Sequence, residues 1–508
     1  MKTHLLYRGR DFDWEAALPA NHEALIQDLN LETILGAMSG GDEFLHEAAR
    51  QVMLKSFGDD LETIQFRQAI FQDCLQNTAA VRQFYDLAVE ASERKRKQWF
   101  GVLGKYPMGI LSGAIDVLQV LIDSLGKLRL LAREQSRHFR SEGFVTLFKM
   151  IETELPDEYF DRIKTCLKDL RFPDGVLVSA ELGDCAQSSR HTLRRTVRAK
   201  PKLLGRIFSN DGPPSFSFRV KEDDGSGKAI SALRDRGINP VSNALAQSAE
   251  HIGSFFAMLR AELGFYLGAA TLHARLGQQG VPVCLPTPTP VGSGRHTCTG
   301  LRDISLALAV GQQVTGNDLQ ADGRTLFMIT GANQGGKSTF LRATGLAQVM
   351  MQCGMFVTAD AYSVALCRHV FTHFTREEDV SMKSGKFDEE LRRMSAIIDS
   401  ITPDSMILFN ESFSSTNERE GSEIASQIVC ALLEARVKIF FVTHLYELAH
   451  MFWQEDMDIA LFLRAERQTD GRRTFKLLPG EPLETSFGPD LYKEIFEGAG
   501  QKTATAVN

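Results

Sequence analysis

The chain has 508 residues, of which 24% are charged, and a formal net charge of −7. This length allows several domains, and the acidic balance excludes a protein that coats DNA through a uniformly basic surface, so any nucleic-acid contact requires local basic patches. The eight cysteines are scattered without a C-x-x-C pair, and the N-terminus lacks an apolar signal core, which predicts a cytoplasmic protein with reduced thiols and no membrane span.

The first part of the chain has the periodicity of helices. Apolar residues recur at spacings of three and four from about residue 23 to residue 151, and again from about 241 to 276. Leu118, Leu121, Leu125 and Leu128 follow a heptad-like spacing, which is most often produced by packing inside a helical bundle. We therefore expect a largely helical N-terminal region.

A different composition interrupts the helical region. Short strands are expected at residues 175–182 and 216–220, and a loop rich in Gly, Pro, Ser and Asp at 209–227. The window from Arg190 to Arg206 contains seven basic residues and no acidic one. A surface that contacts phosphates has this composition, and so does a solvated helix face or a flexible loop. Its candidate DNA contacts are Arg194, Arg195 and Arg198.

Four prolines between residues 282 and 290 predict a domain boundary, and strands alternate with helices from about residue 296 onward. The expected fold is therefore multidomain, with an α region over residues 1–290 and an α/β domain over 291–508 that ends in a short C-terminal segment.

A glycine-rich motif follows the apolar run 326–330 and precedes a helical pattern. This strand–loop–helix context is what a phosphate-binding P-loop (Walker A) requires, and a chance match in a glycine-rich loop is the alternative. In such a loop, backbone N–H groups and the helix N-terminus surround phosphates, Lys337 reaches the β- and γ-phosphates, and Ser338 holds Mg²⁺. The candidate ATP-binding residues are Gly331, Ala332, Asn333, Gln334, Gly335, Gly336, Lys337, Ser338 and Thr339.

Two further predicted strands end in polar residues. The apolar run 406–409 leads into Asn410 and Glu411. The Asn410 amide oxygen can accept a hydrogen bond from a Mg²⁺-bound water but brings no negative charge, so it leaves the rate of hydrolysis open. Glu411 is placed to orient or deprotonate the attacking water, and an ordinary strand-end carboxylate is the alternative. The run 438–443 leads into His444, a candidate sensor of the γ-phosphate.

Hydroxyl and glycine residues near these strands form a candidate interface between subunits. ATPases that hold nucleotide between two subunits present such residues to the partner's γ-phosphate, and helix capping or turn formation is the competing explanation. The candidates are Ser384, Gly385, Ser415, Thr416 and Asn417.

These motifs, in this order, resemble the MutS family of DNA mismatch-repair ATPases. The loop TGANQGGKST at residues 330–339 is similar to the family's TGPNMGGKST, NESFSSTNEREG at 410–421 to its DEIGRGTSTYDG, and Thr443 to Leu448 to its TH-x-x-EL. Residues 315–319 resemble the segment before the loop, where an aromatic residue commonly contacts adenine, and Val314 stands near that place. On this resemblance we expect no counterpart, near the start of this sequence, of the family's N-terminal mismatch-reading domain with its Phe-x-Glu wedge.

The resemblance implies a helical core and lever region with a clamp-like insertion near residues 172–235, followed by a P-loop ATPase domain of the MutS/ABC-like class. It further implies ATP and Mg²⁺ as cofactors, a homodimer formed through the ATPase domain, and ATP-driven clamping of DNA without sequence preference, including branched or altered DNA, in mismatch repair or related transactions. Two alternatives remain: a nucleotide-dependent protein-interaction switch without DNA binding, and a dimerising P-loop ATPase of the transporter-like class.

Overall fold

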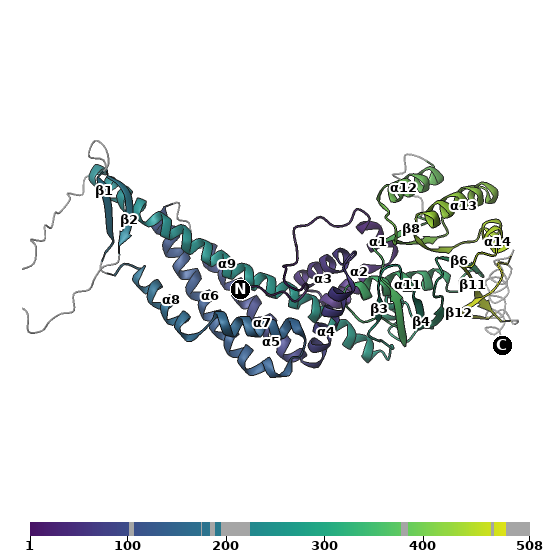
Figure 1. The fold of residues 1–508 in the computed structure, drawn as a ribbon, viewed down its shortest axis with the longest axis horizontal. Coiled ribbons are helices and arrows are strands. Elements are labelled where there is room, and N and C mark those ends of the chain that lie inside the picture. The colour runs from purple at the N-terminus through teal and green to yellow at the C-terminus, as the bar shows by residue number, and fades with distance from the viewer. Residues whose placement is uncertain are drawn as a thin grey trace, which may run out of the picture. The chain divides into compact units, whose positions relative to one another are not determined.

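The computed structural model describes residues 1–100, 106–173, 175–182, 188–194, 224–376, 385–468 and 472–483. Contacts divide the chain into two compact units. The helical unit comprises Met1–Thr3, Ala79–Phe139 and Phe144–Arg260, and the α/β unit comprises His4–Thr78, Arg140–Gly143 and Ala261–Asn508. The architecture is thus mixed, with one mainly helical part and one part built of sheets and helices (Figure 1).

The helical unit is built from long helices and one hairpin. Its elements are α5 (Thr78–Phe100), α6 (Pro107–Gln135), η1 (Ser136–His138), α7 (Glu142–Glu154), α8 (Asp157–Asp169), β1 (Leu177–Leu182), β2 (Ser188–Arg194) and most of α9 (Asp224–Gln278). The heptad-like leucines of α6 are all buried, so this spacing reflects packing inside the bundle, as predicted.

Two segments, Pro107–His138 and Lys228–Gln278, are long and apolar enough to cross a membrane by length and composition alone. Their most apolar windows are 56% and 78% buried inside the protein. Core helices that pack against neighbouring helices have the same composition, so packing accounts for their hydropathy.

The region around the hairpin differs in part from the sequence-based expectation. β1 and β2 pair antiparallel, which confirms a strand near residues 175–182, whereas residues 216–220 lie outside the described residues. Helix α9 starts at Asp224, so the predicted loop at 209–227 was wrong for its last four residues. Pro240 lies inside α9, whereas the predicted helix began only at about residue 241. Prolines disfavour helix interiors, which makes this position unusual.

The α/β unit contains two sheets. Its N-terminal helices are α1 (His22–Asp28), α2 (Leu31–Ser39), α3 (Glu43–Lys55) and α4 (Leu61–Gln76). Later elements are β3 (Thr287–Thr289), β4 (His296–Leu301), α10 (Ile304–Val310), β5 (Asn317–Gln320), β6 (Leu326–Gly331), α11 (Lys337–Gln352), β7 (Ala361–Ala365), β8 (Val370–Phe374), α12 (Lys386–Ser400), β9 (Met406–Asn410), α13 (Glu418–Glu434), β10 (Lys438–Val442), α14 (Tyr446–Gln454), β11 (Ala460–Arg467) and β12 (Arg473–Pro479).

The larger sheet has the strand order β12-β11-β6-β10-β9-β8, and all of its pairings except β11 with β12 are parallel. The smaller sheet has the order β3-β7-β4-β5. The three strands predicted before the candidate site residues are β6, β9 and β10. Because these strands are parallel neighbours, their carboxyl ends lie at one edge of the sheet, where α/β folds place their ligands.

Helices cover both faces of the larger sheet. Met328, Phe409 and Phe441 alternate along their strands and pack against α12, α13 and α14, while α11 contacts β9 and β10 from the other side (Figure 1). On that other side the rings of Phe327 and Phe440 stack with centroids 4.0 Å apart. Strands buried on both faces are continuously apolar, which explains why the sequence signal of β6, β9 and β10 is strong.

The contact-based units differ from the expected division at residue 290. Helices α1 to α4 belong to the α/β unit, where α1 contacts β8, α2 contacts α10, α3 contacts α11 and α4 contacts β3. Local periodicity identifies these segments as helices but carries no information about which distant segment buries their apolar faces. The assignment of 291–508 as a separate functional domain therefore remains a prediction.

Candidate nucleotide-binding site

The loop between β6 and α11 has the backbone that close approach to a ligand requires. Gly331 and Gly336 have φ values of 105° and 90°, and Gln334 has φ 57°. A Cβ on Gly335 would lie 2.5 Å from the Ala465 Cβ atom. Glycine is thus needed at 331 and 336 for conformation and at 335 for space. Asn333 is half-buried and Gln334 is exposed in this loop.

Lys337 folds back onto this loop. It begins α11 and is only 5% exposed, and its ammonium donates to the carbonyls of Gly331 at 2.9 Å and Ala332 at 3.1 Å. Burial lowers the pKa of Lys337 to about 8; nearby Glu411 opposes this shift and nearby Arg473 adds to it. The described hydrogen bonds of this buried ammonium go to neutral carbonyls. An anion bound at the loop would add a direct charge–charge contact and favour the protonated lysine.

The next residue of α11 contacts the end of β9. The Ser338 hydroxyl donates to the Asn410 side-chain oxygen at 2.8 Å, and both residues are partly exposed. Thr339, the next residue of α11, is half-buried. The predicted metal residues Ser338 and Asn410 are thus adjacent, with two neutral oxygens side by side.

The side chains of Glu411 and His444 are in contact across the ends of β9 and β10. The His444 Nε2 atom lies 2.9 Å from a Glu411 carboxylate oxygen, and the two side chains are 29% and 39% exposed. The hydrogen bond from His444 is the largest cause of a lowered pKa at Glu411, followed by its burial, which opposes it, and by the charges of His444 and Lys337. Glu411 has φ 57°, a conformation that costs energy in a non-glycine residue and is common at functional sites.

The residues that follow Glu411 are held by α12 and α13. Glu390 of α12, only 3% exposed, accepts from the Phe413 amide at 3.0 Å and the Ser415 hydroxyl at 2.9 Å. Thr416 donates to Glu420 at 2.8 Å, and the Asn417 side chain caps α13 by accepting from the Glu420 amide at 3.0 Å.

These intrachain contacts match the capping and turn explanation for the candidate interface residues. Gly385 immediately precedes α12 and is exposed, and Ser384 lies outside the described residues. Their role across a subunit interface remains a prediction.

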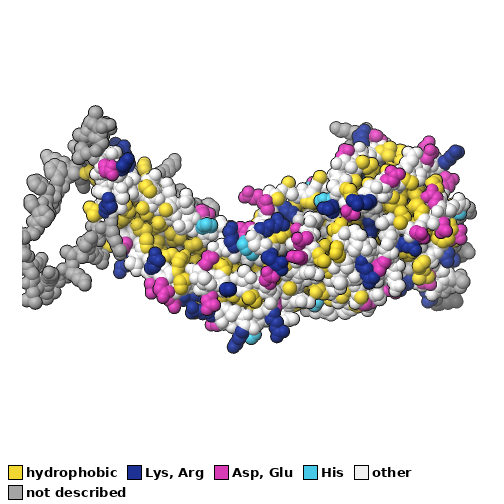
Figure 2. Space-filling view, viewed as in Figure 1, with side chains coloured by type: hydrophobic (Ala, Val, Ile, Leu, Met, Phe, Trp, Pro, Cys, Tyr) yellow, Lys and Arg dark blue, Asp and Glu magenta, His cyan; other side chains and the backbone are white. Residues whose placement is uncertain are grey.

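The candidate DNA contacts are only partly described. Arg194 ends β2, is exposed, and donates from Nε to the Ser179 hydroxyl at 2.8 Å. Arg195 and Arg198 lie outside the described residues. On the face seen in Figure 2, basic and acidic side chains are interspersed, which agrees with the acidic net charge.

Two residues near the loop were not predicted as site residues. Arg473, at the start of β12, donates to the Gln334 side-chain oxygen at 3.3 Å. Asn317 of β5 donates to the Phe475 carbonyl at 3.2 Å and accepts from the Leu477 amide at 2.8 Å. The sequence signal for Asn317 was its place in the family-like segment 315–319, whereas Arg473 carries no motif.

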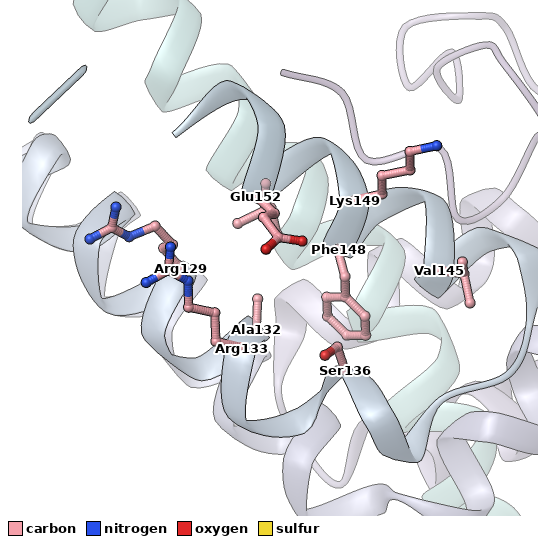
Figure 3. Close-up of a pocket in the computed structure, with 9 residues that line it drawn as sticks. Arg129, Ala132, Arg133, Ser136, Val145, Phe148, Lys149 and Glu152 are labelled. Atoms are coloured by element: carbon pink, nitrogen blue, oxygen red, sulfur yellow. The ribbon is translucent and has the colours of Figure 1, made fainter. Parts of the chain in front are cut away.

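A separate surface pocket of about 320 Å³ lies in the helical unit, where Arg129 and Arg133 of α6 stand opposite Phe148, Lys149 and Glu152 of α7 (Figure 3). Arg129 is engaged there by the Leu155 carbonyl at 3.0 Å and by Asp157 at 2.6 Å. None of the predicted site residues lines this pocket.

Comparison with known proteins assigns both parts of the chain. A family model described as the MutS2 N-terminal domain matches residues 59–279, and one described as MutS domain V matches residues 327–491. The first match relates residues 59–279 to a named domain, whereas periodicity identified this region only as helical.

Individual relatives agree with these matches. The chain is 32% identical over 205 residues to the DNA mismatch repair protein MutS of Porphyromonas gingivalis. This matched segment covers 39% of this chain and 22% of the relative. It is 30% identical over 152 residues to human MutS protein homolog 4, and this segment covers 30% of this chain and 16% of the relative. It is 29% identical over 237 residues to the DNA mismatch repair protein MutS of Thermus aquaticus, and this segment covers 46% of this chain and 27% of the relative. The chain matches only about a quarter or less of the length of these relatives. Together with the two domain matches, these relatives show that the chain belongs to the MutS family.

Proposed function

We propose that the chain is an ATPase whose nucleotide state controls its binding to DNA, in mismatch repair or a related transaction. The observation that carries this proposal is the convergence of three strand ends: the glycine loop after β6, the Ser338–Asn410 contact at 2.8 Å and the Glu411–His444 contact at 2.9 Å. Relatives named as DNA mismatch repair proteins support the DNA part of the proposal.

In this proposal each residue has one role. The loop amides and the N-terminus of α11 bind phosphate oxygens, and Lys337 leaves the carbonyls of Gly331 and Ala332 to pair with the phosphates. Glu411 orients the attacking water or accepts its proton, because the carboxylate stands beside the loop and is ionised at neutral pH. His444 orients that carboxylate and senses the terminal phosphate.

The residues also fit a magnesium ion. Mg²⁺ is usually held by one or two protein oxygens together with waters and phosphates. Ser338 and Asn410 present two such oxygens, and Glu411 adds a negative charge beside them. Among the described residues no group of three His, Cys, Asp or Glu side chains could form an all-protein metal site, so the ion would arrive with the nucleotide. When bound, it neutralises charge on the β- and γ-phosphates.

Two such sites facing each other in a homodimer would let ATP binding close the ATPase domains and hydrolysis release them. Helix α9, which belongs to the region where the resemblance places the family's lever, would pass the movement to a DNA-holding region. The ligand can drive such a change only through contacts that differ between the two states, and the γ-phosphate is the group that differs between ATP and ADP.

The test is ATP hydrolysis by the purified chain with linear, mismatched and branched DNA. We expect stimulation by at least one DNA form, loss of nucleotide binding in Lys337→Ala, and in Glu411→Gln retained binding with turnover slowed by about a hundredfold or more. Equal hydrolysis by wild type and Glu411→Gln would contradict the assignment of Glu411. Hydrolysis that is indifferent to every DNA, with no DNA binding, would favour the protein-interaction switch.

A further inference from the structure

Arg473 is the second strongly basic group beside the phosphate loop. It stands at the first position of β12, 139 residues after Gln334, whose side-chain oxygen it contacts at 3.3 Å. Its charge acts on Lys337 across the loop and is one cause of the lowered pKa there. Two cations held close to each other around one loop repel, and the arrangement is favourable once an anion lies between them.

The Arg473 guanidinium also has unused hydrogen-bonding capacity. Its Nε atom is buried and has no hydrogen-bond partner within the part of the chain that the structure describes. A buried, unpaired donor on a charged group is costly unless a ligand completes it. Among the described residues, Arg473 donates to the neutral side-chain amide of Gln334, which carries no negative charge to balance the guanidinium.

The backbone of β12 is fixed beside the loop, so Arg473 does not depend on a mobile segment for its position. Asn317 binds the Phe475 carbonyl and the Leu477 amide, and a Cβ on Gly336 would lie 3.5 Å from the Phe475 Cβ atom. Strand β12 therefore passes directly over the start of α11. The contact with Gln334 places Arg473 next to the loop, and the approach to Gly336 places Phe475 there.

We propose that Arg473 is a phosphate-binding residue of the nucleotide site, supplied by the same chain and closing the loop on the side opposite Lys337. This inference rests on the proposed function and deepens it, because it adds a second cation for a nucleoside di- or triphosphate. Arginine suits this role because its planar fork can bind two phosphate oxygens at once.

The experiment measures ATP and ADP affinity by calorimetry for wild type, Arg473→Ala, Arg473→Gln and Arg473→Lys. We expect Arg473→Ala and Arg473→Gln to weaken both nucleotides by about tenfold, and Arg473→Lys to recover part of the loss. Arg473→Gln keeps a polar side chain for Gln334, so it separates the loss of charge from a disturbed loop.

The matched control is Arg464→Ala. Arg464 is an exposed arginine on neighbouring β11, and it follows the alternation of that strand away from the loop because the adjacent Ala465 faces Gly335. This control removes the same charge from the same end of the sheet, and its nucleotide affinity should equal that of wild type.

Partial recovery in Arg473→Lys, with none in Arg473→Gln, is a readout that a purely structural role would not produce. Unchanged affinity in Arg473→Gln, with binding lost in Lys337→Ala, would overturn the role of Arg473 and leave the proposed function intact.

Two other outcomes are distinguishable. Wild-type nucleotide affinity in Lys337→Ala would refute the nucleotide site itself. Weakened DNA binding without nucleotide in Arg473→Gln, together with unchanged ATP affinity, would assign Arg473 to DNA phosphates and overturn the inference.

Discussion

Lys337 is a charged side chain that the fold has removed from water without giving it an anionic hydrogen-bond partner. Its ammonium binds two loop carbonyls, and burial lowers its pKa to about 8. Bound phosphate favours the protonated form, so nucleotide binding should raise this pKa and take up a proton near pH 8.

This coupling predicts how nucleotide affinity depends on pH. Affinity should be constant below about pH 7.5 and fall as pH rises through 8, approaching about tenfold per pH unit. Titration of ATP between pH 7.5 and 9.5 checks this, because the terminal phosphate is already ionised throughout that range. Lys337→Arg stays charged and is the control for effects at other groups. A flat wild-type profile would show that Lys337 does not pair with the nucleotide.

Asn410 is the residue where the site departs from most P-loop enzymes, which carry an aspartate at this position. Its side-chain oxygen accepts the Ser338 hydroxyl proton at 2.8 Å. Asn410→Asp adds one negative charge beside that hydroxyl, and we expect half-maximal hydrolysis at about tenfold lower Mg²⁺. Asn410→Ala removes the acceptor and should raise the Mg²⁺ requirement. Identical Mg²⁺ dependence in Asn410→Asp and wild type would argue against an ion at this position.

At the scale of elements, a buried side chain helps to join the two sheets of the α/β unit beside the site. Asn317 of β5 is 5% exposed and hydrogen-bonds the backbone of β12 at Phe475 and Leu477. Together with the hydrogen bond from the Lys476 ammonium to the Gly316 carbonyl, it holds the middle of β12, two residues from Arg473, beside β5.

Asn317→Ala should loosen the middle of β12. Two buried backbone groups would lose their partners, at a cost of about 1–3 kcal/mol each where water cannot replace them. We expect faster hydrogen exchange over residues 473–479 with unchanged protection of β6, and weaker nucleotide binding. Asn317→Asp keeps the acceptor for the Leu477 amide and should be intermediate. Unchanged exchange in β12 would show that strand pairing with β11 alone fixes it.

For the whole molecule, the acidic net charge and the mixed face in Figure 2 mean that any DNA affinity has to be local. The basic window at residues 190–206 is the candidate. Phosphate contacts release counterions, so binding through this window should weaken with salt and show little preference for base sequence.

Replacing Arg194, Arg195 and Arg198 with Glu should lower DNA affinity by at least tenfold and flatten its salt dependence, while ATP binding survives. A matched control makes the same charge change in the α/β unit at three exposed arginines, Arg392, Arg419 and Arg436. Equal DNA affinity in the basic-window variant and wild type, measured by fluorescence anisotropy at several salt concentrations, would remove this window from the DNA-binding surface.

The amino-acid sequence by itself determined the local chemistry of the site. The glycine spacing at 331–336 encodes a loop, and the apolar runs before Asn410 and His444 encode buried strands, because these signals act between residues close in the chain. The predicted strands β6, β9 and β10 are confirmed, and the Ser338–Asn410 and Glu411–His444 contacts follow from parallel neighbours ending at one edge. The functional roles of these residues remain predictions.

Only the tertiary structure decided which distant segments meet. It placed helices α1 to α4 in the α/β unit, joined Asn317 to β12, and brought Arg473 to the tip of the loop. No periodicity or motif encodes these pairings, because they depend on the order of strands in the sheets and on which apolar faces pack together. Strand β12 pairs antiparallel with β11 at the sheet edge, and β11 pairs with β6. This topology carries Arg473, which has no sequence signature, to the candidate nucleotide site.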